Sequence, residues 1–509
     1  MALVTIIVFL SLFAVFTFLG FAAAYWRKGD LSDLGQWALA GRRLGPYLAW
    51  FLVGADLYTA YTFIAVPSAA FASGAIFAYA TPYVMATFAV AMIVMVTLWK
   101  MSRQKNYITG VDFVRERFNS KTLAIAIAAT GIIAELPYIA LQIVGMRAVL
   151  IVMLEPYFPT TLAGTSEVAL IISFVVLAVF TFVSGLRGAA LTAIMKDVII
   201  LTTVLAVIIY VPTQINGGFA AAFQSAHTIA PKVSFATLSP TLTNAYVSLF
   251  VLSALQLYLY PHAINGVLSS KNVRTVRFST ALLPLYGVGL FLLTLFGVLV
   301  YAVPKALAIV HPAGVAANGT LVVPALISAT MPDWFAGFAF LGIFIGGLVP
   351  AAVMAISQAN LLTRNIIKEF VPNLKPKTET LIVKWTSVLF KFMALAFVFV
   401  VSDTYAIQLQ LLGGIFIAQT LPAIMLGLYD RTFLHKWALL AGWVVGMSSG
   451  IWLTLEANNF SILSTSFMKS PFGLLYISAT ALAINVLICY VGSALARLVV
   501  PSAKPAPAD

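Results

Sequence analysis

Thirteen apolar stretches divide this chain of 509 residues, and each is long enough to form a helix across a lipid bilayer. A bilayer core requires about 20 apolar residues per crossing helix. Hydrophobic residues make up 62% of the chain and charged residues 9%, with a mean hydropathy of +1.02, which excludes a soluble protein of this size. We therefore predict an all-α polytopic membrane protein with 13 transmembrane helices, near residues 3–27, 46–71, 76–99, 122–154, 166–185, 189–213, 243–268, 276–302, 334–368, 379–402, 404–428, 434–455 and 472–499.

The net charge of +13, from 29 basic and 16 acidic residues, is concentrated in alternate loops. The loops of the other side contain only Lys232, Lys305 and Lys469. Since basic loops remain in the cytoplasm, we predict a multi-pass protein of the cell (inner) membrane, with its N-terminus outside and its C-terminus in the cytoplasm. The expected partner of this charge is anionic lipid and not nucleic acid. The basic loops contain Arg27, Lys28, Arg42, Arg43, Lys100, Arg103, Lys105, Arg115, Arg117, Lys121, Lys271, Arg274, Arg277, Arg364, Lys368, Lys375, Lys377, Arg431 and Lys436.

The chain has no residue set typical of an enzyme or a metal site. Its single cysteine, Cys489, lies in the last span, and its four histidines are scattered. We therefore predict no catalytic residues, no cofactor and no metal. A channel and a sensor module are the competing classes, and a sensor would need a signalling domain, which we do not expect after the last span.

Two spans contain residues that interrupt helices. In the second span, Asp56 follows Gly54, and a charge in the membrane costs about 3 kcal/mol, which indicates a function. The seventh span contains Tyr260-Pro261-His262, where proline removes a backbone hydrogen bond. These breaks stand five spans apart, and paired broken helices indicate a transporter built from two inverted repeats. The predicted organisation is an extra N-terminal helix with a cytoplasmic linker at 1–45, a first five-helix repeat at 46–213, an outer loop at 214–242, an inverted second repeat at 243–428, two C-terminal helices at 429–500 and a disordered tail at 501–509.

Motifs along nearly the whole chain resemble those of the sodium/solute symporter family. They lie at 41–46, 109–118, 184–187, 260–262 and 351–354. Within the family, the segments at 193–197, 260–270 and 359–365 resemble the monocarboxylate permease branch most closely. The resemblance implies a leucine-transporter-type 5+5 inverted repeat. It also implies the import of small carboxylates such as lactate, pyruvate and acetate.

The same resemblance implies where a coupling sodium ion would lie, between the break of the second span and the middle of the ninth. The two hydroxyl ligands of sodium-coupled members fall on Ala355 and Ile356, whose side chains have no oxygen. Ser357 follows, but one residue turns a helix by about 100°, so we expect it to point elsewhere. The region of the former sodium site comprises Ala55, Tyr58, Ala352, Ala355 and Ile356.

The sixth span supplies two charges, Lys196 and Asp197, where the family's ion site would have a wall. An ammonium group can take the place of the sodium ion, and a buried lysine can bind and release a proton. Asp56, on the facing span, is the expected partner of Lys196 or the proton carrier itself. We therefore predict proton coupling through Asp56, Lys196 and Asp197. Each residue also has a structural alternative to proton coupling. Lys196 would extend to the cytoplasmic face, Asp197 would pair locally, and Asp56 would hold the broken span.

The predicted substrate site lies near the membrane midplane, beside the two breaks. Tyr138 and Gln142 stand four residues apart on one helix face and resemble a pattern in the family's substrate-facing span. We expect His262 to be a substrate ligand, a proton acceptor or a packing residue. Two roles are open for Arg147: it attracts an anionic substrate, or it extends to the outer interface. The exposed amides at the start of a half-helix can also hold a carboxylate. The candidate substrate residues are Tyr138, Gln142, His262, Asn265, Gln408 and Arg147.

These observations predict a secondary active transporter that imports small monocarboxylates by alternating access. The coupling ion is predicted to be the proton, with sodium less favoured. The alternative is a sodium-coupled symporter of another small organic solute, such as an amino acid.

Overall fold

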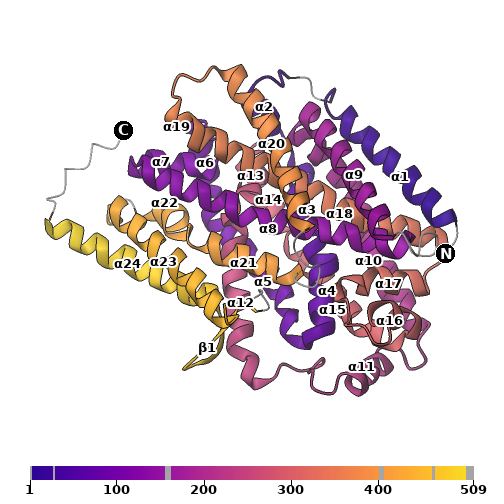
Figure 1. Cartoon of the computed structure of the whole chain (residues 1–509). Coiled ribbons are helices and arrows are strands. Elements are labelled where there is room, and N and C mark those ends of the chain that lie inside the picture. The colour runs from indigo at the N-terminus through magenta and orange to yellow at the C-terminus, as the bar shows by residue number, and fades with distance from the viewer. Residues whose placement is uncertain are drawn as a thin grey trace.

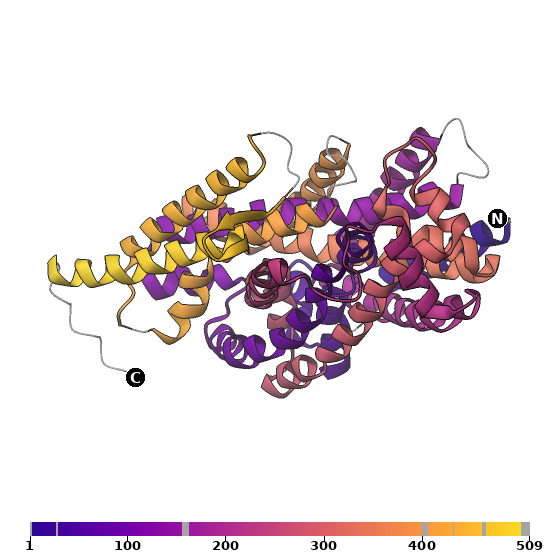
Figure 2. The same ribbon diagram turned by 90° about the horizontal axis from the view of Figure 1, so that it is seen from below.

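The protein is an assembly of helices, seen in a computed structural model that describes residues 3–26, 29–154, 162–399, 406–430, 432–460 and 465–499 (Figure 1). The predicted disordered tail lies outside these residues. The first helix and the last lie at opposite ends of the molecule in both views (Figures 1 and 2). The helices are α1 (Leu3–Ala22), α2 (Leu34–Ala38), α3 (Pro46–Ala55), α4 (Val66–Ser73), α5 (Ala80–Val90), α6 (Val96–Lys105), α7 (Gly110–Phe118), α8 (Lys121–Leu154), α9 (Leu162–Ser184), α10 (Leu186–Thr213), α11 (Gly218–Ile229), α12 (Thr243–Gln256), α13 (Pro261–Leu268), α14 (Val273–Ala281), α15 (Pro284–Leu299), α16 (Pro304–Val310), α17 (Val322–Thr330), α18 (Asp333–Asn360), α19 (Lys368–Phe370), α20 (Pro376–Val398), α21 (Ala406–Ala418), α22 (Gly427–Tyr429), α23 (Lys436–Ala457) and α24 (Ile477–Val499).

By length and composition, 11 helices of the described chain can cross a membrane, or up to 12 if the bent pair Ala406–Ala418 and Pro422–Tyr429 is one span. The multi-pass helical architecture is therefore confirmed, while the number 13 remains a prediction. The count of 12 is one below the predicted 13 because the run Tyr61–Lys105, with 45 residues, counts as one candidate span. A straight helix of this length would measure about 68 Å, more than twice a bilayer core. It contains a 3-10 segment, Gly74–Tyr79, where the predicted second and third spans meet.

The second span is broken where the sequence predicts. Helix α3 ends at Ala55, and regular structure resumes with a π-helical turn at Tyr61–Ala65 that continues into α4. Between them the backbone amides of Leu57 and Tyr58 both donate to the Gly54 carbonyl at 2.9 Å. The last turn of α3 therefore includes an i→i−3 hydrogen bond, and the regular α-helical pattern ends there.

The seventh span is also broken at its predicted position. Helix α12 and the 3-10 turn Leu257–Leu259 end before Tyr260, whose backbone is extended with φ −63° and ψ 132°. Pro261 is then the first residue of α13, where its missing amide hydrogen costs nothing. Proline therefore starts a new half-helix here.

Helix α18 is the most deeply buried span, with its whole apolar window buried inside the protein. It packs against α8, α10, α1 and α20, and α8 and α18 run through the middle of the molecule (Figure 1). Gly347 allows the closest approach to α8, because a Cβ there would lie 2.6 Å from the Gln142 carbonyl oxygen. Small residues allow membrane helices to pack backbone against backbone in this way.

The loops predicted to share the basic side do lie together. Arg42 donates to the Tyr107 carbonyl at 2.6 Å, and Arg115 forms an ion pair with Glu369 at 2.6 Å. These contacts join the loop before α3, the α6–α7 region and the end of the ninth span. Which side of the membrane they face remains a prediction.

Loops predicted on the opposite side also meet one another. The amide of Ala75 donates to the Ser234 carbonyl at 2.8 Å, and the Thr5 hydroxyl donates to the Asp333 carbonyl at 2.9 Å. Helix α11 lies within the predicted outer loop at 214–242. The strands β1 (Phe467–Ser470) and β2 (Gly473–Tyr476) form an antiparallel hairpin, so the last helix begins five residues later than predicted, at Ile477.

We predict that Gly347→Ala lowers stability by about 1–3 kcal/mol, because the added methyl group forces α8 and α18 apart. The apparent melting temperature of the purified protein in detergent measures this effect. Gly45→Ala is the control, since a Cβ at Gly45 has no atom within 4 Å. Equal melting temperatures for the two variants would contradict the close packing.

Candidate functional site

The break of the second span directs two backbone carbonyls toward one side chain. Nζ of Lys196, on α10, donates to the Ala55 carbonyl at 3.2 Å and to the Tyr58 carbonyl at 2.7 Å. Both carbonyls belong to the predicted region of the former sodium site. The break therefore exposes two oxygens, and a protein cation binds them.

Lys196 has its anionic partner on its own helix. Its Nζ lies 2.8 Å from Oδ1 of Asp197, and both side chains are fully buried. The other carboxylate oxygen of Asp197 accepts a hydrogen bond of 2.7 Å from the Tyr286 hydroxyl on α15. The Tyr58 hydroxyl in turn donates to the Tyr286 carbonyl at 3.2 Å. The local pairing that the sequence left as an alternative for Asp197 is formed, and it ties α10 to the broken span and to α15.

Asp56 is not paired with Lys196. Both oxygens of its buried carboxyl lack a hydrogen-bond partner among the described residues. Oδ2 lies 3.9 Å from the position of a Cβ on Gly266, and His262 stands one turn earlier on the same face of α13. The expected pair is thus not formed, and Asp56 faces the second broken helix.

In the ninth span, Ala352, Ala355 and Ile356 are fully buried within α18. Their side chains offer no oxygen to a cation. The Ser357 hydroxyl, expected to point elsewhere, lies 2.9 and 3.0 Å from the two carboxylate oxygens of Glu135 on α8. The hydroxyl that directly follows Ala355 and Ile356 in the chain is therefore bound to the carboxyl group of Glu135.

Glu135 forms the second charged cluster of the site, with His262 and Ser357. Its Oε1 accepts from the His262 backbone amide at 2.9 Å and lies 2.7 Å from Nδ1 of the same residue. The carboxylate thus lies at the N-terminus of α13, where the helix dipole favours negative charge. Glu135 was not among the predicted site residues, although an acid two residues before Pro137, in a membrane span, was a signal for one. A half-helix N-terminus could also have held a substrate carboxylate. At α13 this position is occupied by the carboxylate of Glu135.

Gln142 supports the broken span. Its side-chain oxygen accepts from the Ala60 amide at 2.9 Å, and its side-chain amide donates to the Tyr138 carbonyl at 3.1 Å. Ala60 lies directly before the second half of the span, so Gln142 satisfies a backbone amide that the break exposes. The structure thus gives Gln142 a positioning role, and its role as a substrate ligand stays a prediction. Tyr138 lies beside His262, with ring centroids 5.7 Å apart.

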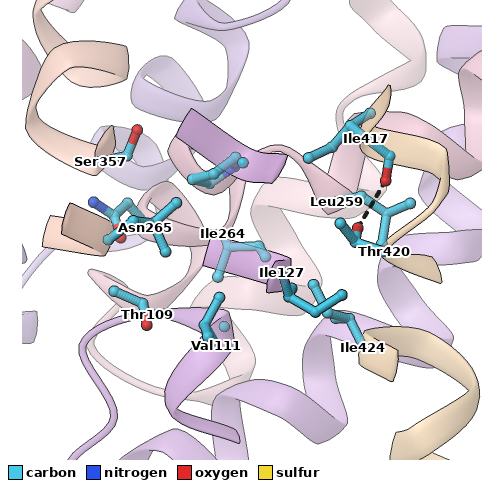
Figure 3. A pocket seen from close by; sticks show the side chains of 14 residues that line it. Thr109, Val111, Ile127, Leu259, Ile264, Asn265, Ser357, Ile417, Thr420 and Ile424 are labelled. Carbon is cyan, nitrogen blue, oxygen red and sulfur yellow. Dashed lines mark hydrogen bonds between the residues drawn. The ribbon is translucent and has the colours of Figure 1, made fainter. Parts of the chain in front are cut away.

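Several polar atoms near the seventh-span break are buried without a hydrogen-bond partner among the described residues, among them Tyr260 Oη, His262 Nε2 and Asn265 Nδ2. Buried polar groups are nearly always hydrogen-bonded, so these atoms are suited to a polar ligand or to water. Asn265 and Ser357 lie on the same side of a cavity of about 10 Å³, enough for about one water molecule (Figure 3). Thr109, in the loop before α7, lines the same cavity.

The remaining candidates are Arg147 and Gln408. Arg147 forms an ion pair of 3.8 Å with Glu167 on α9, and its side chain is 22% exposed. Gln408, on α21, is half-buried, whereas Gln410 two residues later is buried. Within the described ranges, no three His, Cys, Asp or Glu side chains lie close enough to hold a metal ion.

We predict that Gln142→Met lowers stability by about 1–3 kcal/mol, because it leaves the Ala60 amide buried without an acceptor. Gln410→Met is the matched control, since the side-chain oxygen of Gln410 has no partner in the described structure. Thermal melting of both variants in detergent measures the difference. A Gln142→Met protein as stable as the control would show that this hydrogen bond does not support the break.

Comparison with known proteins identifies the family. The family model "Sodium:solute symporter family" matches residues 37–446. A "Monocarboxylate transport permease protein" of Rhizobium johnstonii is 40% identical over 492 residues, which cover 96% of each chain. The "Uncharacterized symporter YodF" of Bacillus subtilis is 32% identical over 467 residues, which cover 87% of this chain and 90% of the relative.

Among solved structures, a substrate-bound, outward-open, sodium-coupled sialic acid symporter has the same fold. It superposes with a TM-score of 0.75 at 14% identity and covers 97% of this chain and 98% of its own. A manganese transporter of Eremococcus coleocola superposes with a TM-score of 0.51 at 16% identity, covering 89% of this chain and 94% of its own. These matches and the family model agree with the broken spans, and the chain is a multi-pass membrane transporter that belongs to the sodium:solute symporter family.

Proposed function

We propose that this transporter imports small monocarboxylates together with protons, by alternating access. The observation that carries the proton coupling is the contact of Lys196 with the Ala55 and Tyr58 carbonyls. The relative named as a monocarboxylate transport permease supports the substrate class. Lactate, pyruvate and acetate are the members of that class proposed here.

The ammonium group of Lys196 can donate three hydrogen bonds, and three acceptors lie within reach. These are the two carbonyls and Oδ1 of Asp197, at 2.7 to 3.2 Å. A sodium ion would need the same oxygens, and Ala355 and Ile356 add none. We infer that the lysine supplies the positive charge that sodium supplies elsewhere in the family. Because Lys196 is part of the chain, the ion that moves must be another, and the proton can bind to a side chain such as Asp56.

We further propose that two inverted five-helix repeats, at 46–213 and 243–428, enclose the site, with 13 spans in all. The two breaks would then be equivalent elements of the two repeats. The basic loops would face the cytoplasm, with the N-terminus outside. The small organic anion would contact the unpartnered groups of Tyr260, His262 and Asn265, beside Tyr138.

We predict that purified protein in proteoliposomes accumulates lactate or pyruvate when the outside is made acidic, with or without sodium. Protein-free vesicles are the essential control, because undissociated acids cross lipid unaided. Counterflow of labelled substrate that saturates would distinguish a carrier from a channel. Uptake that follows a sodium gradient and ignores pH would instead support the alternative, a sodium-coupled symporter of another organic solute.

We also predict that sodium can replace the missing charge when Lys196 is shortened. In the triple variant Lys196→Ala, Ala355→Ser, Ile356→Ser, sodium should raise the melting temperature, because an ion that binds only the folded state stabilises it. Potassium should have less effect, and the wild-type protein should respond to neither ion. A wild-type protein that sodium stabilises as strongly as the variant would contradict the role proposed for Lys196.

A further inference from the structure

The cluster of Glu135, His262 and Ser357 has the geometry of a site that can gain and lose a proton without rearrangement. All three side chains are buried, with at most 1% exposure. They come from three helices, α8, α13 and α18, that meet beside the seventh-span break. Neither Glu135 nor Ser357 is among the residues proposed to contact the substrate or to replace sodium.

Ser357 can form a hydrogen bond with Glu135 whether its carboxyl group is ionised or protonated. Its hydroxyl lies 2.9 and 3.0 Å from the Glu135 oxygens and 2.7 Å from the Met354 carbonyl. A hydroxyl has one hydrogen and accepts through its lone pairs. When Glu135 is ionised, the hydroxyl can donate to the carboxylate. When Glu135 is protonated, the hydroxyl can turn to Met354 and accept from the acid, so both states are hydrogen-bonded.

The imidazole of His262 offers a second position for the proton. Nδ1 is held 2.7 Å from Glu135, while Nε2 is buried and without a partner among the described residues. With the ring hydrogen on Nδ1, Nε2 has a free lone pair. One proton added there would convert the cluster into a carboxylate–imidazolium pair, and no heavy atom would need to move.

Asp56 and the small cavity both adjoin the elements that form the cluster. Asp56 faces the α13 surface that carries His262, as the position of Gly266 indicates. Ser357 lines the cavity, which also reaches Thr109 in a basic-side loop (Figure 3). A proton could therefore arrive from the second-span break and leave toward the loops proposed to be cytoplasmic.

The charged and titratable groups around the cluster are few. Asp56 faces it from the second span, and Lys196 and Asp197 on α10 are paired with each other. The rings of Tyr138 and Tyr260 flank the imidazole at 5.7 and 5.5 Å. The Asp56 carboxyl and the Tyr260 hydroxyl have no hydrogen-bond partner among the described residues.

We propose that Glu135, His262 and Ser357 form the binding site of the coupling proton, and that Asp56 and the cavity beside Asn265 are its two approaches. This inference rests on the proposed proton coupling and goes beyond it, because it places the exchangeable proton on Glu135 and His262 and not on Asp56. The competing role is a static one, in which Glu135 only caps α13.

Glu135→Gln separates these roles, because glutamine keeps an oxygen for the His262 amide but cannot take up or release a proton. Two assays on the same proteoliposomes are needed. Net accumulation under a pH gradient requires proton binding and release. Counterflow at equal pH exchanges substrate for substrate and does not require net proton release. We predict that Glu135→Gln loses accumulation above protein-free vesicles and keeps counterflow.

Two further variants complete the test. Glu116→Gln is the matched control, since Glu116 lies in a solvent-exposed pair with Lys105 and should behave as wild type in both assays. Ser357→Ala removes the hydroxyl that serves both states and should slow net uptake more than counterflow. This variant also provides the test if Glu135→Gln does not fold.

The outcomes divide clearly. If Glu135→Gln and Ser357→Ala accumulate substrate as the wild type does, the proton site is wrong although proton coupling stands. If a variant loses counterflow together with accumulation, Glu135 or Ser357 has a static or substrate-binding role, and the inference is also wrong. If the wild-type protein itself follows sodium and ignores pH, the proposed function fails first.

Discussion

The fold of this transporter depends on how two broken helices are held inside a membrane, where no water can satisfy exposed backbone groups. At the first break, a cation from α10 binds the carbonyls at the end of α3. At the second, an anion from α8 binds the amide at the start of α13. Each charge matches the helix dipole it meets, positive at a C-terminus and negative at an N-terminus. Lys196 and Glu135 are thus structural counterparts, and each break is stabilised by a side chain from a neighbouring span.

These two charges differ in how completely they are neutralised. The Lys196 ammonium meets three acceptors, one of them an adjacent carboxylate, and Tyr286 binds the other oxygen of that carboxylate. Glu135 meets a backbone amide, an imidazole and a hydroxyl, and none of these carries a permanent charge. A charge with a permanent partner suits a fixed part of the fold. A charge held by groups that can both donate and accept suits exchange.

The sequence predicted the features that local chemistry determines. Gly54 before Asp56 marked the first break, Pro261 the second, and the basic residues marked which loops lie together. It could not predict which polar groups meet across helices, because a shift of one residue turns a side chain by about 100°. The expected pair of Asp56 with Lys196 was therefore wrong, and the hydrogen bonds of Gln142 and Glu135 were missed. The helix α11 within an expected loop and the late start of α24 reflect short segments whose apolar pattern is weak.

The ammonium group at the first break also has an electrical consequence. A sodium ion that travels with its substrate brings its charge across the membrane, whereas a lysine remains where it is. A cycle that carries one proton with one monocarboxylate would move no net charge, so the membrane potential could not drive it. The substrate gradient that such a carrier sustains would be set by the pH difference alone. Uptake at this one-to-one ratio would thus not depend on the voltage of the cell.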